Sequence, residues 1–228
     1  MLKVLLSIIM LFIITACGGS SGNGNTNTPN VPNPPSTESS KVACVGDSIT
    51  LGYGLNDPAE SYPSQLNTML GADFTVGNFG AYGATALKES NDPYWGTQEY
   101  INSQSFAPDI VVIMFGTNDL MNHNWSYEDK FISDYSDLIN IYKNLESRPT
   151  VYICYPPPIF GEISGITDAH IRNQLLPMID QIATINGVQI IDNYNSLIGD
   201  ERHFEKDDIH PNAEGARIMA ETVYQAIY

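Results

Sequence analysis

Short continuous apolar runs alternate along the chain with longer segments in which apolar residues recur at helical spacing. The continuous runs are typical of strands buried on both faces of a sheet, and they predict strands at residues 42–45, 110–115 and 151–154. Two further strands are expected at residues 74–79 and 188–191, where polar residues interrupt the apolar ones. The helical spacing predicts helices over residues 62–70, 127–145, 171–185 and 211–227. Because strands and helices alternate, we expect an α/β fold with a parallel sheet covered by helices on both faces.

The N-terminal segment has a different pattern. Residues 1–16 carry one charged side chain, Lys3, followed by an apolar run that ends at Ile14. A membrane-spanning helix takes about 20 apolar residues, so this shorter run is typical of a secretory signal peptide. The sequence Ile14-Thr15-Ala16-Cys17 resembles a bacterial lipobox, which predicts cleavage before Cys17 and a lipid on its sulfur. The alternative is an ordinary signal peptide with an unrelated cysteine.

Residues 17–40 are rich in Gly, Ser, Asn and Pro and are nearly free of large apolar side chains. Such a segment cannot bury a core, so we expect a disordered tether between the lipid and a folded domain at residues 41–228. The sequence therefore predicts an exported bacterial lipoprotein that touches the membrane only through its lipid. Gly18 stands where some lipoproteins carry an aspartate that retains them at the inner membrane, which favours the outer membrane, the periplasm or the cell surface.

The charge balance is acidic, with 10 Lys and Arg against 26 Asp and Glu and a net charge of −16. This balance argues against nucleic acid and anionic membrane surfaces as partners. Cys44 and Cys154 each lie in a predicted strand, and we expect both to be buried thiols. The spacing of Cys and His residues does not resemble a metal site, so no metal or other cofactor is expected.

Four short polar motifs lie where strands are predicted to end or where the last helix is predicted to begin. They are Gly46-Asp47-Ser48-Ile49, Gly80-Ala81-Tyr82-Gly83, Gly116-Thr117-Asn118-Asp119 and Asp207-Asp208-Ile209-His210. Ligands of parallel sheets bind beyond the carboxyl ends of the strands, so three of these motifs are expected to meet there. An enzyme that hydrolyses an ester with a serine nucleophile also needs a base, a carboxylate that orients the base, and hydrogen-bond donors for the oxyanion. Those roles can be filled by Ser48, His210, Asp207, and the pair Gly83 and Asn118.

Each motif also has a simpler explanation. Ser48 suits the N-cap of a helix, Gly80 and Gly83 suit tight turns, and Asn-Asp is common in turns. We expect Asp119 to cap its own turn rather than to join the chemistry.

The carboxylate and the histidine have rivals as well. Asp208 competes with Asp207, although its offset from His210 is less suitable, and Asp200 with His203 repeats the three-residue spacing of Asp207 and His210. The remaining histidines, His123 and His170, are expected on the surface together with His203.

Taken in order, the four motifs resemble those of the GDSL esterases and lipases, also called SGNH hydrolases, over residues 41–228. Ile49 stands where this family usually has Leu, and Ala84 stands where many relatives have an acidic or hydroxyl residue. The run Pro211-Asn212-Ala213-Glu214-Gly215 resembles the usual continuation of the family motif, which favours His210 over His203.

The resemblance implies a flavodoxin-like three-layer α/β/α sandwich with a five-stranded parallel sheet of order 2-1-3-4-5, which would separate the strands of Cys44 and Cys154. It also implies a serine esterase without a cofactor. In such an enzyme Ser48 attacks, His210 moves the proton and Asp207 orients His210. The oxyanion is bound by the N–H groups of Ser48 and Gly83 and by the side chain of Asn118.

The substrate is predicted from the loops. Trp95 and Trp125 follow the second and third predicted strands and are expected at the rim of the site, where indole rings stack on sugars; the alternative is that they fill the core beneath long loops. No long apolar insertion resembles a lipase lid. The motifs look most like those of bacterial sialate or carbohydrate O-acetylesterases, so a monomeric esterase that removes acetyl groups from carbohydrate is expected. Its alternatives are a lysophospholipase, a general short-chain lipase or arylesterase, and a non-catalytic glycan-binding lipoprotein.

Overall fold

The computed structural model describes Ser39 to Tyr228. The predicted signal peptide, Cys17 and all but the end of the predicted tether lie outside these residues. The described part contains a sheet of five parallel strands in the order β2-β1-β3-β4-β5, as predicted. The strands are β1 (Ser40–Gly46), β2 (Phe74–Gly80), β3 (Ile110–Met114), β4 (Thr150–Tyr155) and β5 (Gln189–Asp192).

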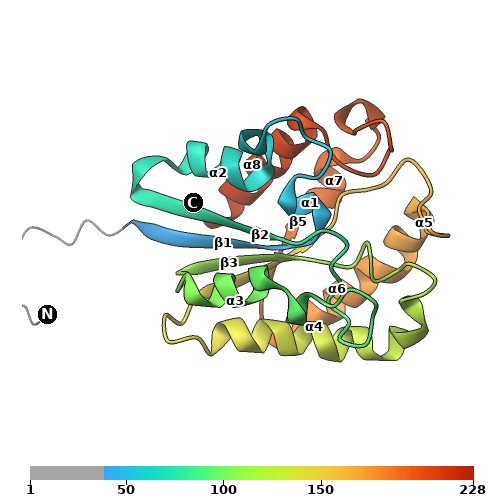
Figure 1. Cartoon of the computed structure of the whole chain (residues 1–228), viewed down its shortest axis with the longest axis horizontal. Helices are drawn as coiled ribbons and strands as arrows, with labels where there is room; N and C mark the ends of the chain where they lie inside the picture. Colours follow the sequence, from blue (N-terminus) through green and yellow to red (C-terminus); the bar gives the residue numbers. More distant parts are fainter. Residues whose placement is uncertain (1–38) are drawn as a thin grey trace, which may run out of the picture. The chain divides into compact units, whose positions relative to one another are not determined.

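Helices cover both faces of the sheet, which gives the predicted three-layer sandwich (Figure 1). One layer contains α1 (Ser48–Leu51), α2 (Tyr62–Leu70), α7 (Asn193–Leu197) and α8 (Ala213–Ile227). The other layer contains α3 (Gln98–Ser105), α4 (Glu128–Lys143) and α6 (Leu176–Asn186), with α5 (Asp168–His170) ahead of α6. Within residues 39–228, no helix combines the length and the apolar character that crossing a membrane requires.

Two apolar cores lie on opposite faces of the sheet, because successive side chains of a strand point to opposite sides. On β1, Ala43 and Val45 face the core under α4 and α6, whereas Val42 and Cys44 face the core under α2 and α8. Cys154 belongs to the second core, and β3 lies between its strand and that of Cys44. Both cysteines are buried free thiols, and burial raises the pKa of each thiol above its ordinary value.

Several helices differ from those that the periodicity predicts. The last helix begins at Ala213 rather than at residue 211, because the side chain of Asn212 accepts hydrogen bonds from the N–H groups of Glu214 and Gly215 and so caps it. The helix predicted over residues 171–185 consists of a π-helical turn, Ile171–Leu175, followed by α6. Helix α3 escaped prediction since only Ser103 of its residues is fully buried, so it has no apolar stripe.

Gly80 allows α1 to pack closely on the end of β2. A Cβ at this position would lie 2.1 Å from the backbone nitrogen of Leu51, a residue of α1. Gly80 does not have a positive φ, so close approach rather than turn conformation is what requires glycine there. This contact fixes the position of the short helix that begins with Ser48.

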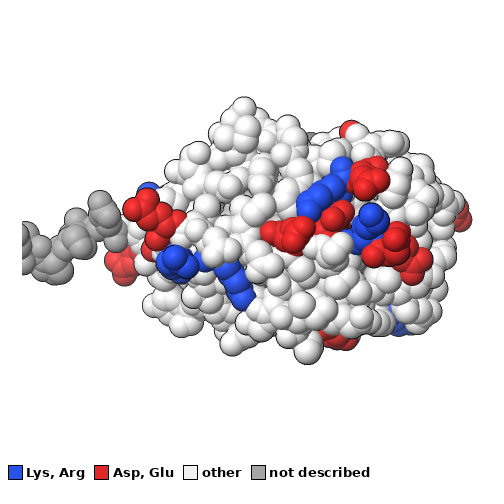
Figure 2. All heavy atoms as spheres, turned by 90° about the horizontal axis from the view of Figure 1, so that it is seen from below, with Lys and Arg blue, Asp and Glu red and all other residues white. Residues whose placement is uncertain are grey.

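On the face of the molecule that α3 and α4 form, positive and negative side chains lie next to one another and do not gather into a patch of one charge (Figure 2). On α4, Asp134 and Asp137 pair with Lys88, and Lys130 pairs with Glu89. Asp134 is buried, but the other side chains of these pairs are partly or largely exposed, so the pairs of Asp137 and of Glu89 contribute little to stability.

Candidate active site

Ser48 lies at the carboxyl end of β1, at the first residue of α1, and is almost fully buried. The helix is capped by Asp47, whose side chain accepts a hydrogen bond of 2.9 Å from the N–H of Ile49. The alternative reading of Ser48 as the N-cap is therefore wrong. Because the preceding residue caps the helix, the hydroxyl of Ser48 is free for another partner.

That partner is His210, which the fold brings to Ser48 from 162 residues further along the chain. Ser48 Oγ lies 2.9 Å from His210 Nε2, and His210 Nδ1 lies 2.7 Å from Asp207 Oδ2. The other oxygen of Asp207 accepts hydrogen bonds from the backbone N–H groups of Ile209 and His210. The sequence spacing of Asp207 and His210 thus corresponds to one tight turn in which a single carboxylate holds both the backbone and the imidazole.

The environment of Asp207 favours its ionised form. Partial burial opposes ionisation, but the hydrogen bonds from the backbone and side chain of His210 and from the N–H of Ile209 outweigh it and lower the pKa of the carboxyl below its ordinary value. Nδ1 of the imidazole therefore faces a carboxylate.

The rival residues do not contact Ser48. Asp208 has a positive φ of 60°, and its backbone carbonyl accepts hydrogen bonds from Phe160 and Gly161. Asp200 is occupied by Arg202, with which it forms a bidentate pair of 2.6 and 2.8 Å. His203 lies 3.9 Å from the same carboxylate.

Gly83 and Asn118 line the same cavity as Ser48 and His210. Gly83 has a φ of 72°, and its N–H has no acceptor among residues 39–228. Asn118 donates one amide hydrogen to the carbonyl of Ala84 at 3.1 Å, which leaves its second amide hydrogen available. The side-chain amide of Asn124 donates a hydrogen bond of 2.9 Å to the backbone carbonyl of Asn118 and so holds that residue in place.

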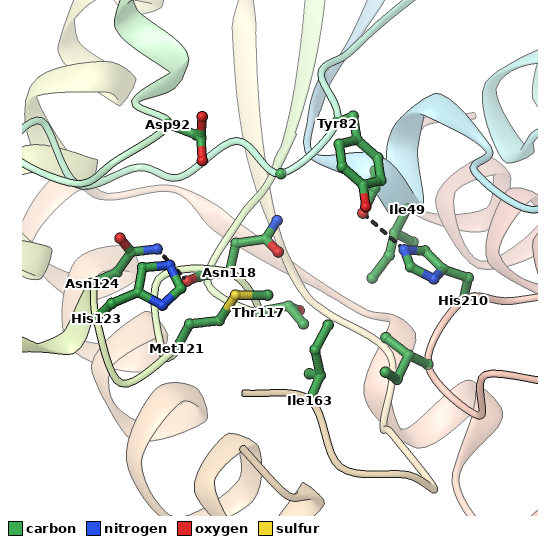
Figure 3. Close-up of a pocket in the computed structure, with 13 residues that line it drawn as sticks. Ile49, Tyr82, Asp92, Thr117, Asn118, Met121, His123, Asn124, Ile163 and His210 are labelled. Carbon is green, nitrogen blue, oxygen red and sulfur yellow. Dashed lines mark hydrogen bonds between the residues drawn. The ribbon is translucent and has the colours of Figure 1, made fainter. Parts of the chain in front are cut away.

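The cavity has a volume of about 250 Å³ and two chemically different ends. Figure 3 shows Tyr82 beside His210 at one end, His123 and Asn124 together at the other with Asp92 above them on a separate loop, and Asn118 between the two ends. Apolar side chains line the rest of the cavity, namely Ile49, Met121, Ile163 and Ile209.

Five of the residues that line the cavity lie outside the four motifs and were missed from the sequence. They are Asp92, Met121, His123, Asn124 and Ile163, and Tyr82 was given no role within its motif. Their position after β2, β3 and β4 is the only signal that could have identified them, because loops at the carboxyl edge converge there. His123 is exposed as predicted, but it is also part of the cavity wall.

The two tryptophans do not lie where the sequence led us to expect. Neither Trp95 nor Trp125 lines the cavity around Ser48. Trp95 packs on Tyr100, donates its indole N–H to the carbonyl of Ala86 at 2.8 Å and carries the Lys88 ammonium over its ring. Trp125 packs on Phe131 of α4. Both rings are partly buried against the core, so their rim position is corrected in favour of the packing alternative.

Two buried carboxyl groups lie beneath the site. We expected Asp119 to cap its own turn. Its carboxyl also accepts hydrogen bonds from the N–H groups of Ala86 and Leu87 and so ties the loop after β3 to the loop after β2. Burial raises the pKa of both Asp47 and Asp119 to about 7, although backbone hydrogen bonds oppose the rise. The charge of Asp119 raises the pKa of Asp47 further.

No group of three or more His, Cys, Asp or Glu side chains in the described part of the chain is arranged to hold a metal ion. The groups around Ser48 are hydroxyl, imidazole, amide and carboxyl groups that meet one another directly. The chemistry available here is proton transfer to and from a serine hydroxyl beside free hydrogen-bond donors.

Comparison with known proteins places these residues in a family context. The family model described as the GDSL-like Lipase/Acylhydrolase family matches residues 44–218. An acetylxylan esterase of Xylanibacter ruminicola is 33% identical in an alignment of 208 residues, which covers 83% of this chain and 43% of that protein. The chain therefore spans less than half the length of this relative.

Solved structures with the same fold include two bacterial esterases of similar length. A putative arylesterase from Agrobacterium tumefaciens is 22% identical, with a TM-score of 0.66. The match covers 82% of this chain and 98% of that chain. A carbohydrate acetylesterase family member from Sinorhizobium meliloti is 20% identical, with a TM-score of 0.64. The match covers 82% of this chain and 97% of that chain. A two-domain esterase described as active on acetylated mannans is 20% identical, with a TM-score of 0.62. The match covers 84% of this chain and 50% of that chain.

Burial of Asp47 predicts a characteristic pH dependence of stability. Its pKa in the folded protein lies above that in the unfolded chain, so between pH 4 and 7 the folded protein keeps a proton that the unfolded chain releases. The free energy of unfolding should therefore fall as pH rises, by about 1.4 kcal/mol per pH unit for one such group, and level off above pH 7. Asp47→Asn keeps an acceptor for the N–H of Ile49 but does not titrate, so urea unfolding from pH 4.5 to 7.5 should show a shallower decline.

Asp57 supplies the matched control. Its side chain accepts from the N–H of Ala59 at 2.9 Å in the same type of turn, but on the surface. Asp57→Asn should leave the decline unchanged. Identical slopes in the wild type and Asp47→Asn would show that Asp47 is ionised in the folded protein over this range.

Proposed function

Since the chain belongs to the GDSL-like lipase/acylhydrolase family, which makes it a carboxylic ester hydrolase, we propose that Ser48, His210 and Asp207 are its catalytic triad. The observation that carries this proposal is the continuous chain of hydrogen bonds from Ser48 Oγ through the imidazole to Asp207 Oδ2. His210 takes the serine proton as Ser48 attacks the ester carbonyl and returns it to the leaving alcohol. Water then repeats the sequence on the acyl-enzyme and releases the acid.

The oxyanion that forms at the carbonyl needs donors that are already in place. The N–H of Gly83 and the second amide hydrogen of Asn118 are free and line the same cavity as Ser48. The N–H of Ser48, in the first turn of α1, is the third donor of the proposed oxyanion hole. One such donor typically contributes about 2.7–4 kcal/mol to stabilisation of the transition state.

We propose that the acyl group is short, with acetyl as the preferred group. The leaving alcohol must lie beside His210, so the acyl group points the other way, past Asn118. That end of the cavity finishes in Asp92, His123 and Asn124 (Figure 3). A long alkyl chain would have to displace water from these polar groups, which is unfavourable, whereas a methyl group fits against Met121 and Ile163.

Carbohydrate is the alcohol that the comparisons favour. The relative from Xylanibacter ruminicola is named an acetylxylan esterase, and solved structures of the same fold include a carbohydrate acetylesterase family member and an esterase described as active on acetylated mannans. Together with the polar acyl end, these relatives support removal of acetyl groups from a polysaccharide.

Substitution of the triad gives the direct test of the mechanism. Ser48→Ala should lower kcat for p-nitrophenyl acetate by roughly 10³- to 10⁶-fold, and Asp207→Asn by roughly 10³- to 10⁴-fold because the imidazole loses its oriented tautomer. Asp208→Asn is the matched control, since Asp208 is the neighbouring acid and Asn tolerates its positive φ. It should change kcat by less than about twofold. Equal losses in Asp207→Asn and Asp208→Asn, with both variants folded by circular dichroism, would refute the assignment of Asp207.

The substrate proposal is tested by comparing kcat/KM across acyl lengths and alcohols. We expect acetylated xylo-oligosaccharides to be preferred to lysophospholipids, and p-nitrophenyl acetate to p-nitrophenyl octanoate, because the long chain meets the polar end of the cavity. His123→Leu makes that end less polar and should improve octanoate turnover relative to acetate. A wild type that prefers octanoate or lysophospholipid would overturn the proposal and favour a lipase or lysophospholipase.

We also propose that Cys17 carries a lipid and attaches the enzyme outside the cytoplasm. The support is the lipobox-like sequence and the tether-like composition up to residue 40. Mass spectrometry of the N-terminal peptide from the native host should find a diacylglyceryl group on Cys17, and Cys17→Ser should release the protein from the membrane fraction. An unmodified Cys17 in the mature chain would refute the anchor.

A further inference from the structure

The end of the cavity beside His210 carries two exposed aromatic rings. Tyr53 follows α1 and Tyr82 follows β2, and the two residues are 46% and 64% exposed. Their ring centroids lie 4.8 Å apart, and the ring of Tyr53 lies 4.9 Å from that of His210. The three rings form a continuous row from the imidazole to the surface.

The direction of the reaction identifies what this row meets. His210 Nε2 must donate its proton to the oxygen of the leaving alcohol, so the alcohol part of the ester lies next to the imidazole. Tyr82 lines the cavity on that side, whereas the acyl side ends at Asp92 and His123 (Figure 3). A group bonded to the ester oxygen would therefore lie over the tyrosine rings rather than over the polar end.

The two tyrosines have the chemistry of a sugar platform. Both residues are exposed, and within residues 39–228 the ring of Tyr82 packs against no aromatic ring other than that of Tyr53. An exposed aromatic ring offers an apolar face for the C–H groups of a pyranose, and its hydroxyl can bond a sugar hydroxyl. The two tryptophans do not serve this site, because neither lines the cavity around Ser48.

We propose that Tyr82, supported by Tyr53, forms the subsite that binds the sugar ring carrying the scissile acetyl group. This inference rests on the proposed esterase function and adds the residues that select the alcohol. Tyr82 stacks on the pyranose, and Tyr53 holds Tyr82 at the imidazole so that the stacked sugar presents its ester oxygen to Nε2. The occupant is a carbohydrate, with a flat aromatic alcohol as the competing possibility for the same surface.

The test is the ratio of kcat/KM for an acetylated xylo-oligosaccharide to kcat/KM for ethyl acetate, whose alcohol has no ring. Tyr82→Ala should lower this ratio roughly three- to tenfold, mainly through a higher KM for the oligosaccharide. Tyr82→Phe keeps the stacking face and should lower it by less than about twofold. Tyr228→Ala is the matched control, because Tyr228 is a 76% exposed tyrosine that stacks on Tyr224 rather than on His210; it should leave all constants unchanged.

The outcomes separate failure of this subsite from failure of the proposed function. If the wild type hydrolyses no ester, the esterase proposal itself fails. If the wild type is active on both substrates but Tyr82→Ala leaves the ratio unchanged, the esterase proposal is supported and the sugar subsite at Tyr82 and Tyr53 is refuted. A fall in p-nitrophenyl acetate turnover by Tyr82→Ala without any effect on the oligosaccharide would assign the platform to aromatic alcohols and overturn the sugar assignment.

Discussion

The hydrogen bond between Ser48 and His210 joins the end of the first strand to the turn before the last helix. Its geometry depends on nearly every level of the fold. The parallel sheet brings the carboxyl ends of its strands to one edge, and Gly80 lets α1 approach β2 closely enough to fix Ser48 there. On the other side, the loop before α8 is closed by a hydrogen bond of 2.7 Å from the N–H of Glu205 to the carbonyl of His210. Both partners are thus held by backbone contacts before any substrate binds.

Hydrogen bonds from the backbone to carboxylates organise the rest of the site. Asp207 holds the turn of His210, Asp47 caps the helix of Ser48, and Asp119 ties the loops that carry Gly83 and Asn118. Their environments differ, however. Asp207 is partly exposed and has a lowered pKa, whereas burial raises the pKa of Asp47 and Asp119. The acid that would face the imidazole stays charged, while the two acids that support the loops hold their protons to higher pH.

The cavity is asymmetric in a way that matches the two parts of an ester. One end carries the exposed rings of Tyr53 and Tyr82 beside His210, and the other ends in Asp92 and His123. In the proposed reaction the sugar occupies the aromatic end and the acetyl group the polar end. A preference for a ring-shaped alcohol and a short acid would then arise from different loops, those after α1 and β2 on one side and those after β2 and β3 on the other.

The sequence by itself determined the sheet, most of the longer helices and the four motifs that meet at the site. Continuous apolar runs and helical spacing reflect burial, which is a local property of each segment, and the turn between Asp207 and His210 is local as well. The sequence favoured Asp207 over Asp208 by spacing alone, but it offered Ser48 as a helix cap and gave no sign that Asp47 caps α1, because the backbone direction of the folded turn decides which residue caps a helix. The sequence also did not predict the weakly amphipathic α3 or the π-helical turn at Ile171–Leu175. Only the tertiary structure placed Trp95 and Trp125 against the core and Tyr53 and Tyr82 beside His210, because the exposure of an aromatic ring in a loop depends on which distant segments cover it.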